Sequence, residues 1–191
     1  MNIFYLSHDQ REAVKFHNDR HVVKMIVEYA QLLSTAHRAV DGKMKIVTND
    51  KGRKGKVWEL SDSREHKLYK ATHVNHPSNI WTRESKENYL WLYELWVQLI
   101  AEWKYRYDHP ISKYHAAERQ LKDALCNAPN GIISKGFTEM PQAMGEEFMI
   151  KGNSIEAYKN YYIKDKQHLA SWKKRGAPDW YVFDKNKMLS F

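Results

Sequence analysis

Hydrophobic residues at steps of three and four predict a long first helix over residues 11–40. Within it, residues 22–36 are apolar on most sides, a pattern typical of a central and mostly covered helix. Asp9 followed by Glu12 matches a capping box at the start of this helix, and Gly42 is placed as its C-terminal cap. The pattern therefore predicts one unbroken helix of about 45 Å at the centre of the fold.

A second long helix is expected over residues 78–107, where aromatic and leucine residues recur at helical spacing. We interpret this stripe as core rather than as a platform for stacking bases. Residues 2–6 are expected to be extended, 63–72, 112–126 and 154–174 to be helical, and 127–152 to be loops. Apolar runs around a glycine-rich centre predict a small β-hairpin, or a basic flap, near 44–60. The whole chain, 1–191, is predicted to be mainly α: a compact single-domain helical bundle around a long central first helix.

The composition suits a packed domain with an acidic partner. The chain has 191 residues, of which 13% are aromatic, and this argues against a disordered basic tail. The formal net charge of +8 favours nucleic acid as a partner, although many basic proteins bind none. A single cysteine, Cys126, argues against an internal disulfide and a cysteine-built zinc site. With no apolar stretch near the roughly 18 residues of a membrane span and no signal-peptide pattern, we expect a cytoplasmic protein without a membrane partner.

The segment between Lys43 and Lys56 concentrates positive charge, with Asp50 as its one acidic residue. One interpretation is a solvated loop. The other is an arm that contacts phosphates, with candidates Lys51, Arg53, Lys54 and Lys56.

The predicted first helix carries a narrow polar stripe at steps of three and four: His17, His21, Lys24, Glu28, Gln31 and Thr35. It is either the solvent-facing side of an amphipathic helix or the floor of a site. In the second case, a partly dry groove would raise the pKa of Glu28 and suit it to act as general acid or base.

Two simpler interpretations of the stripe are a metal site and a structural ion pair. His17 and His21 have the i, i+4 spacing that can hold a metal, but Glu28 lies two turns further and no third ligand has suitable spacing, so we expect no metal. The other interpretation is that Lys24 and Glu28 are only a helix-surface ion pair, although lysine before glutamate is the less favourable order. No cofactor is expected.

Three stretches, in this order, resemble the pyrimidine-dimer DNA glycosylase family, the phage endonuclease V type and its bacterial relatives. They are Asn18 to Glu28 with the following Tyr-Ala-Gln-Leu-Leu, Thr72 to Pro77 with the aromatic residues from Tyr89 to Arg106, and Arg175 to Tyr181. The family's catalytic glutamate falls on Glu28. The resemblance implies a mainly helical domain that bends DNA and acts on a base taken out of the stack.

The polar stripe and the resemblance together give candidate roles for individual residues. Glu28 is the central acid or base, with His21, Lys24 and His76 as further catalytic candidates. The substrate-binding candidates are His17, Gln31, Asn75, Arg83, Trp180 and Tyr181, with the last two lining the base site. The phosphate-binding candidates are the basic residues of 43–56 together with Lys173, Lys174 and Arg175.

Two departures from the family pattern bear on the reaction. Those glycosylases form an imine through the α-amine of a small second residue, where this chain has Asn2, and the arginine before the glutamate is replaced by Val27. Lys24 is an alternative amine. The expected partner is DNA, and the protein either excises a thymine-derived base or modifies it. In the second version an amino acid or other amine displaces pyrophosphate from an activated 5-methyluracil, as in thymine hypermodification. A non-catalytic DNA-binding or phage–host interaction protein, and an enzyme acting on free nucleotides, are the remaining alternatives.

Overall fold

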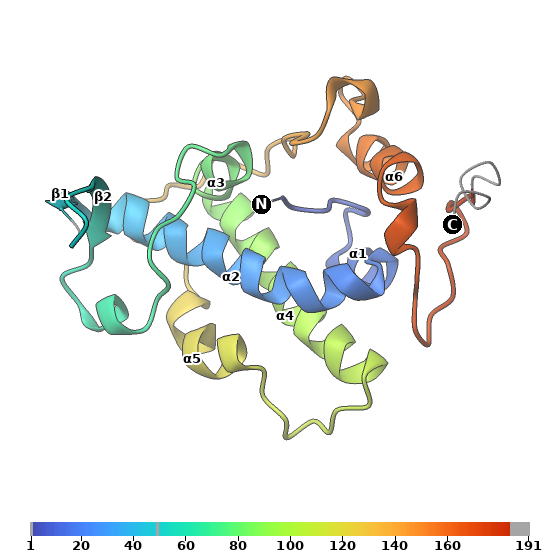
Figure 1. Cartoon of the computed structure of the whole chain (residues 1–191), viewed down its shortest axis with the longest axis horizontal. Coiled ribbons are helices and arrows are strands. Elements are labelled where there is room, and N and C mark those ends of the chain that lie inside the picture. The colour runs from blue at the N-terminus through green and yellow to red at the C-terminus, as the bar shows by residue number, and fades with distance from the viewer. Residues whose placement is uncertain (1, 49, 184–191) are drawn as a thin grey trace.

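The computed structural model describes residues 2–48 and 50–183 (Figure 1). The α-helices within them are α1 (Gln10–Phe16), α2 (Asp19–Asp41), α3 (Pro77–Thr82), α4 (Lys86–Arg106), α5 (Ala116–Leu125) and α6 (Ser154–Lys164). The 3-10 turns are η1 (Ser63–His66), η2 (Glu146–Phe148) and η3 (Gln167–Leu169), and the strands are β1 (Lys43–Thr48) and β2 (Lys54–Glu59). The prediction of a mainly α protein with a small hairpin is confirmed.

The prediction of one unbroken helix over 11–40 is wrong, because α1 and α2 are separate. The chain leaves the helical conformation at His17 and Asn18, whose ψ angles are 131° and 163°. The Asn18 side chain then accepts a hydrogen bond from the His21 N–H and caps α2. The expected cap at Asp9 is confirmed, since its side chain accepts the N–H of Glu12.

The expected end at Gly42 is also confirmed, and its physical reason is a close approach. The Gly42 N–H donates to the Arg38 carbonyl, and a Cβ at Gly42 would lie 2.4 Å from that oxygen. The Arg38 side chain then fixes the base of the hairpin, because it donates to the carbonyls of Trp58 and Tyr69 and to the Glu65 carboxylate. The hairpin therefore starts from a rigid point at the end of α2.

The second predicted helix, 78–107, is also interrupted. Its two parts are α3 and α4, and α4 begins where the Ser85 side chain accepts the N–H of Asn88. The interpretation of its aromatic stripe as core is confirmed, since Tyr89, Leu92 and Trp96 have no exposed surface.

The remaining elements are shorter than expected. Helix 154–174 ends at Lys164 in α6, 112–126 starts only at Ala116, and 63–72 contains one 3-10 turn. Residues 2–6 are extended but pair with no strand, and Ile3, Phe4, Tyr5 and Leu6 are buried in the core. Figure 1 shows this segment running from near the middle of the molecule, beside α2, towards α1.

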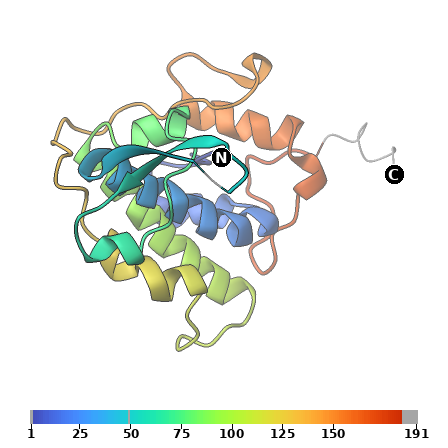
Figure 2. The ribbon, with the colours of Figure 1, turned by 60° about the vertical axis from the view of Figure 1, so that its left-hand side comes forward.

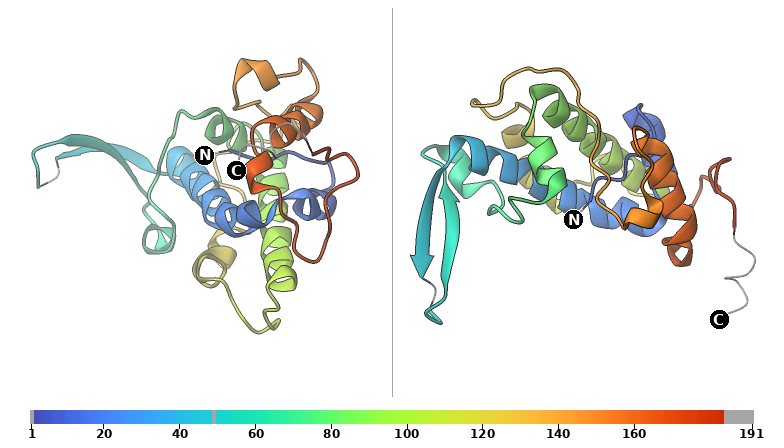
Figure 3. Two further views of the ribbon diagram at one scale, coloured as in Figure 1. Left: turned by 45° about the vertical axis from the view of Figure 1, so that its right-hand side comes forward. Right: turned by 90° about the horizontal axis from the view of Figure 1, so that it is seen from above.

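The arrangement places α2 across α4, with α3 and α5 also packed on α2 (Figure 1). The hairpin comes forward of the helices in Figure 2 and stands clear of them in both views of Figure 3. Among the described residues, no helix is long and apolar enough to cross a bilayer.

Candidate active site

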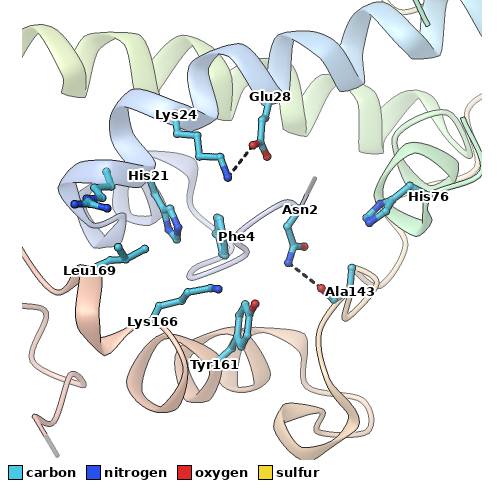
Figure 4. A pocket seen from close by; sticks show the side chains of 11 residues that line it. Asn2, Phe4, His21, Lys24, Glu28, His76, Ala143, Tyr161, Lys166 and Leu169 are labelled. Carbon is cyan, nitrogen blue, oxygen red and sulfur yellow. Dashed lines mark hydrogen bonds and ion pairs between the residues drawn. The ribbon is translucent and has the colours of Figure 1, made fainter. Parts of the chain in front are cut away.

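A pocket of about 490 Å³ lies against one side of α2, which is a typical size for a small-ligand site (Figure 4). Its lining residues are Asn2, Phe4, Arg20, His21, Lys24, Glu28, His76, Ala143, Tyr161, Lys166 and Leu169. They come from the buried first segment, from α2, from the cap of α3, from the loop before α6, and from α6 with the turn after it. Residues far apart in the sequence therefore meet at one cavity.

Glu28 and Lys24 form one wall of this pocket. The Glu28 carboxylate lies 3.0 Å from Lys24 Nζ, and the side chains are 18% and 66% exposed respectively. Among the described residues that line the pocket, Glu28 supplies the one carboxylate, whereas Arg20, Lys24 and Lys166 supply positive charge. The pocket suits an anionic ligand, and Glu28 is placed to exchange a proton with it.

His21 forms the floor of the pocket and is held as a neutral ring. It stacks on Phe4 with ring centroids 4.0 Å apart and an angle of 14° between the planes. The Tyr162 hydroxyl donates to His21 Nδ1 at 2.6 Å. Burial, followed by the charges of neighbouring groups that include Lys24, lowers the pKa of His21 to about 2.

This hydrogen-bond pattern assigns the tautomer of His21. Because Nδ1 accepts from Tyr162 and from the Asn18 side-chain amide, the proton of the neutral ring is on Nε2. His21 is therefore suited to donate a hydrogen bond, for example to a carbonyl oxygen of a base, and is a poor general base at neutral pH.

His76 joins the pocket to a second hollow. It caps α3 by accepting the Ser78 N–H on Nδ1, and burial lowers its pKa. The second hollow, about 610 Å³, is lined by Lys56, Trp58, Ala71, Thr72, His73, Val74, Asn75 and His76. His73 has a φ of 48°, in the left-handed region that few residues other than glycine adopt. The predicted residue Asn75 thus lies beside the pocket rather than in it.

Two predicted substrate residues of the polar stripe do not line the pocket. His17 is fully buried, with Nδ1 donating to the Ala13 carbonyl at 2.8 Å and Nε2 accepting from the Tyr29 hydroxyl at 2.9 Å. The break between α1 and α2 turns it away from the line that a continuous helix would give. Gln31 is half-buried on α2, beyond Glu28. No group of three or more possible metal ligands occurs within 2–48 and 50–183.

Arg83, Trp180 and Tyr181 also lie outside the pocket. Arg83 donates to the Val74 carbonyl at 2.7 Å and so supports the loop before α3. Trp180 packs edge-on against Phe16 with centroids 5.6 Å apart, and Tyr181 is buried against Trp172. Because α6 ends at Lys164, the later chain folds back over α1, and its aromatic residues cover that helix instead of a base site.

The phosphate candidates of the C-terminal segment are engaged in the fold. Lys174 forms an ion pair with Asp108, and Arg175 binds the Glu102 carboxylate with its closest nitrogen 2.7 Å away. Lys173 lies over the ring of Tyr107, 5.3 Å from its centroid. The candidates Lys51, Arg53, Lys54 and Lys56 are exposed on the hairpin.

Sequence reasoning missed most of the lining that does not belong to α2. Phe4, Tyr161 and Lys166 reach the pocket through tertiary packing, and their own sequence neighbourhoods carry no motif for it. The apolar residues at the start of the chain were the one available signal for Phe4, because an apolar first segment is expected to be buried against the central helix.

Comparisons with protein-family models, curated proteins and solved structures found no match. The chemistry of the pocket is therefore derived from its own residues: a carboxylate beside an amine, a neutral imidazole donor, aromatic faces and a basic rim.

Proposed function

We propose that the protein is an enzyme that acts on a pyrimidine base in DNA, with Glu28 as general acid or base. The observation that carries the proposal is the position of Glu28, as the one carboxylate of a pocket whose described lining is otherwise neutral or basic. A phosphate beside the base would be attracted to Arg20 and Lys166, and the half-buried side chain of Tyr161 offers aromatic surface for contact with a base. The proposal includes the fold, a single helical domain around α2 of the endonuclease V glycosylase type.

In the excision version, Glu28 assists attack of water at C1′ of the extruded nucleotide. The new bond joins the water oxygen to C1′, the glycosidic C–N bond breaks, and the base leaves with its electron pair. Glu28 takes the proton of the attacking water, and Lys24 Nζ, 3.0 Å from the carboxylate, holds the carboxylate in position as its ion-pair partner. The Nε2–H of His21 is placed to hydrogen-bond a carbonyl oxygen of the base.

The second hollow favours a modification version, because it provides space for another reactant across His76. There an amine, such as that of an amino acid, attacks the base methyl carbon of a pyrophosphorylated 5-hydroxymethyluracil. The new C–N bond replaces the C–O bond to pyrophosphate, and Glu28 takes a proton from the attacking nitrogen. The glycosidic bond stays intact, which separates this version from excision.

Mass spectrometry of nucleosides tests the proposal and separates its versions. The DNA substrates carry a thymine dimer, 5-hydroxymethyluracil or its pyrophosphorylated form, with mixed amino acids present. An abasic site indicates excision, and a heavier nucleoside with an intact glycosidic bond indicates transfer. Glu28→Gln is expected to lower either activity by about 10²- to 10⁴-fold. Glu94→Gln, on α4 away from the pocket, is the matched control and is expected to retain activity.

Two other outcomes would contradict the proposal. If no substrate changes while binding to DNA persists and weakens with salt, the protein is a non-catalytic DNA-binding protein. If only free nucleotides react, the substrate is not a polymer.

A further inference from the structure

The two faces of the β1–β2 hairpin differ in chemistry. In the antiparallel register Met44 lies opposite Trp58, Ile46 opposite Lys56, and Thr48 opposite Lys54. Residues directly opposite one another share a face, and faces alternate along each strand. Met44, Ile46, Thr48, Lys54, Lys56 and Trp58 therefore form one face, which we call the wedge face. Lys43, Lys45, Val47, Gly55, Val57 and Glu59 form the opposite face.

The wedge face combines exposed apolar side chains with uncompensated positive charge. Ile46 is 66% exposed and Met44 is 45% exposed. On the opposite face Glu59 pairs with Lys45, whereas Lys54 and Lys56 have no carboxylate partner within the part of the chain that the structure describes. A surface that exposes isoleucine and methionine beside lysines suits a partner with an apolar interior and an anionic surface.

The wedge face lies on the side of the candidate active site. Lys56 and Trp58 line the hollow that His76 shares with the Glu28 pocket. The hairpin is held at its base by Arg38 and projects clear of the helices (Figure 3). A long ligand placed over the pocket and the hollow would continue along the wedge face.

We propose that the wedge face enters the minor groove of duplex DNA, where Ile46 and Met44 insert at a base step and Lys54 and Lys56 contact the flanking phosphates. Isoleucine and methionine are among the side chains that unstack base steps and bend DNA in this way. The face has no asparagine, glutamine or arginine and its lysines are assigned to phosphates, so binding is expected to depend little on sequence. The inference rests on the proposed function, because the bend is the step that lets a nucleotide leave the stack near Glu28.

The test measures bending and unstacking without any reaction. A short undamaged duplex carries a fluorescence-transfer pair at its ends, and a second duplex carries 2-aminopurine, whose emission rises on unstacking. The wild-type protein is expected to increase both signals. Met44→Ala combined with Ile46→Ala is expected to abolish both and to weaken binding on the order of tenfold. Val47→Ala is the matched control, because this exposed aliphatic residue lies on the opposite face of the same strand and should keep both signals.

The lysines have a separate expected effect. The double variant Lys54→Gln with Lys56→Gln should make the slope of log affinity against log salt less steep by about 2, because each lost phosphate contact reduces its steepness by roughly 0.9. The Met44 and Ile46 double variant should keep the slope. Unchanged bending in that double variant, or tighter binding to single-stranded than to duplex DNA, would overturn the inference. Glu28→Gln should bend DNA like the wild type, so failure of the proposed chemistry and failure of the wedge give different results.

Discussion

Two ion pairs with the same helical spacing differ in burial and in role. Glu102 and Arg106 on α4 lie 2.7 Å apart with side chains 3% and 0% exposed, and Lys24 and Glu28 on α2 lie 3.0 Å apart with side chains 66% and 18% exposed. The first pair is closed off by protein, and the second faces a pocket. Spacing of i, i+4 alone therefore does not distinguish a structural pair from a candidate reactive one.

The partners of each pair explain the difference. Arg106 uses its guanidinium fully, donating to the carboxylates of Glu102 and Asp19 and to the carbonyls of Val14, Lys15 and His17. Burial alone would raise the pKa of Glu102, but hydrogen bonds from Arg175 and Arg106 hold it below its usual value. In the pocket, Glu28 retains acceptor sites for a ligand. A group with its bonding capacity filled supports the fold, and a group with spare capacity beside a cavity can do chemistry.

Breaking the closed pair should have the largest effect on stability. Arg106→Met removes the buried guanidinium, leaves the carbonyls at the α1–α2 break without donors, and removes one of the two arginine partners of Glu102. The expected loss in the free energy of unfolding is about 3–5 kcal/mol, measured by urea denaturation. If the variant does not fold, Arg175→Met tests the same cluster from the partly exposed side and should cost less. A loss below about 1 kcal/mol for Arg106→Met would contradict this interpretation of the cluster.

Acid should act first through the buried histidines. Burial lowers the pKa of His17 and of His37 to about 4, so both are neutral in the folded protein, while the unfolded chain binds protons near the usual value of 6.5. Between these values the unfolded state holds more protons, so stability is lost as the pH falls from about 6.5 towards 4. Each histidine contributes a slope of up to about 1.4 kcal/mol per pH unit. Urea unfolding at a series of pH values measures the slope.

His17 gives this prediction a direct check. His17→Gln removes one titrating group, so its stability should depend less steeply on pH than that of the wild type, whatever its stability at neutral pH. An unchanged slope would mean that His17 titrates alike in the folded and unfolded protein. This result would weaken the contrast between the closed region and the pocket.

The sequence predicted what local patterns control. The hairpin, the cap at Asp9 and the buried stripe around Trp96 follow from turn residues, capping residues and periodicity. Lys24 and Glu28 of the polar stripe line a pocket, whereas their predicted chemical roles stay predictions. The cap and the buried stripe depend on neighbours within four residues, and the hairpin on a short turn that joins two adjacent strands, so one chain read in order is enough.

The missed features depend on competition or on long-range packing. Asn18 and Ser85 lie within apolar periodicity, but each side chain caps a new helix, and capping won over continuation of the helix. Trp180 is of a residue type that stacks on bases, yet it packs against Phe16, more than 160 positions earlier in the chain. No local pattern reports such a contact. The side-chain direction of His17 was predicted wrongly because the prediction assumed an unbroken helix, whereas the cap at Asn18 starts a new one.

Breaking the open pair should have the smallest effect on stability and so completes the comparison. Lys24→Met keeps most of the side-chain volume and removes the ammonium, whose side chain is 66% exposed. An exposed pair in the order lysine before glutamate contributes little, so the free energy of unfolding should change by less than about 0.5 kcal/mol in the same urea assay. A loss of stability near that of Arg106→Met would show that the two pairs do the same structural work, and the distinction between a filled cluster and an open pocket would fail.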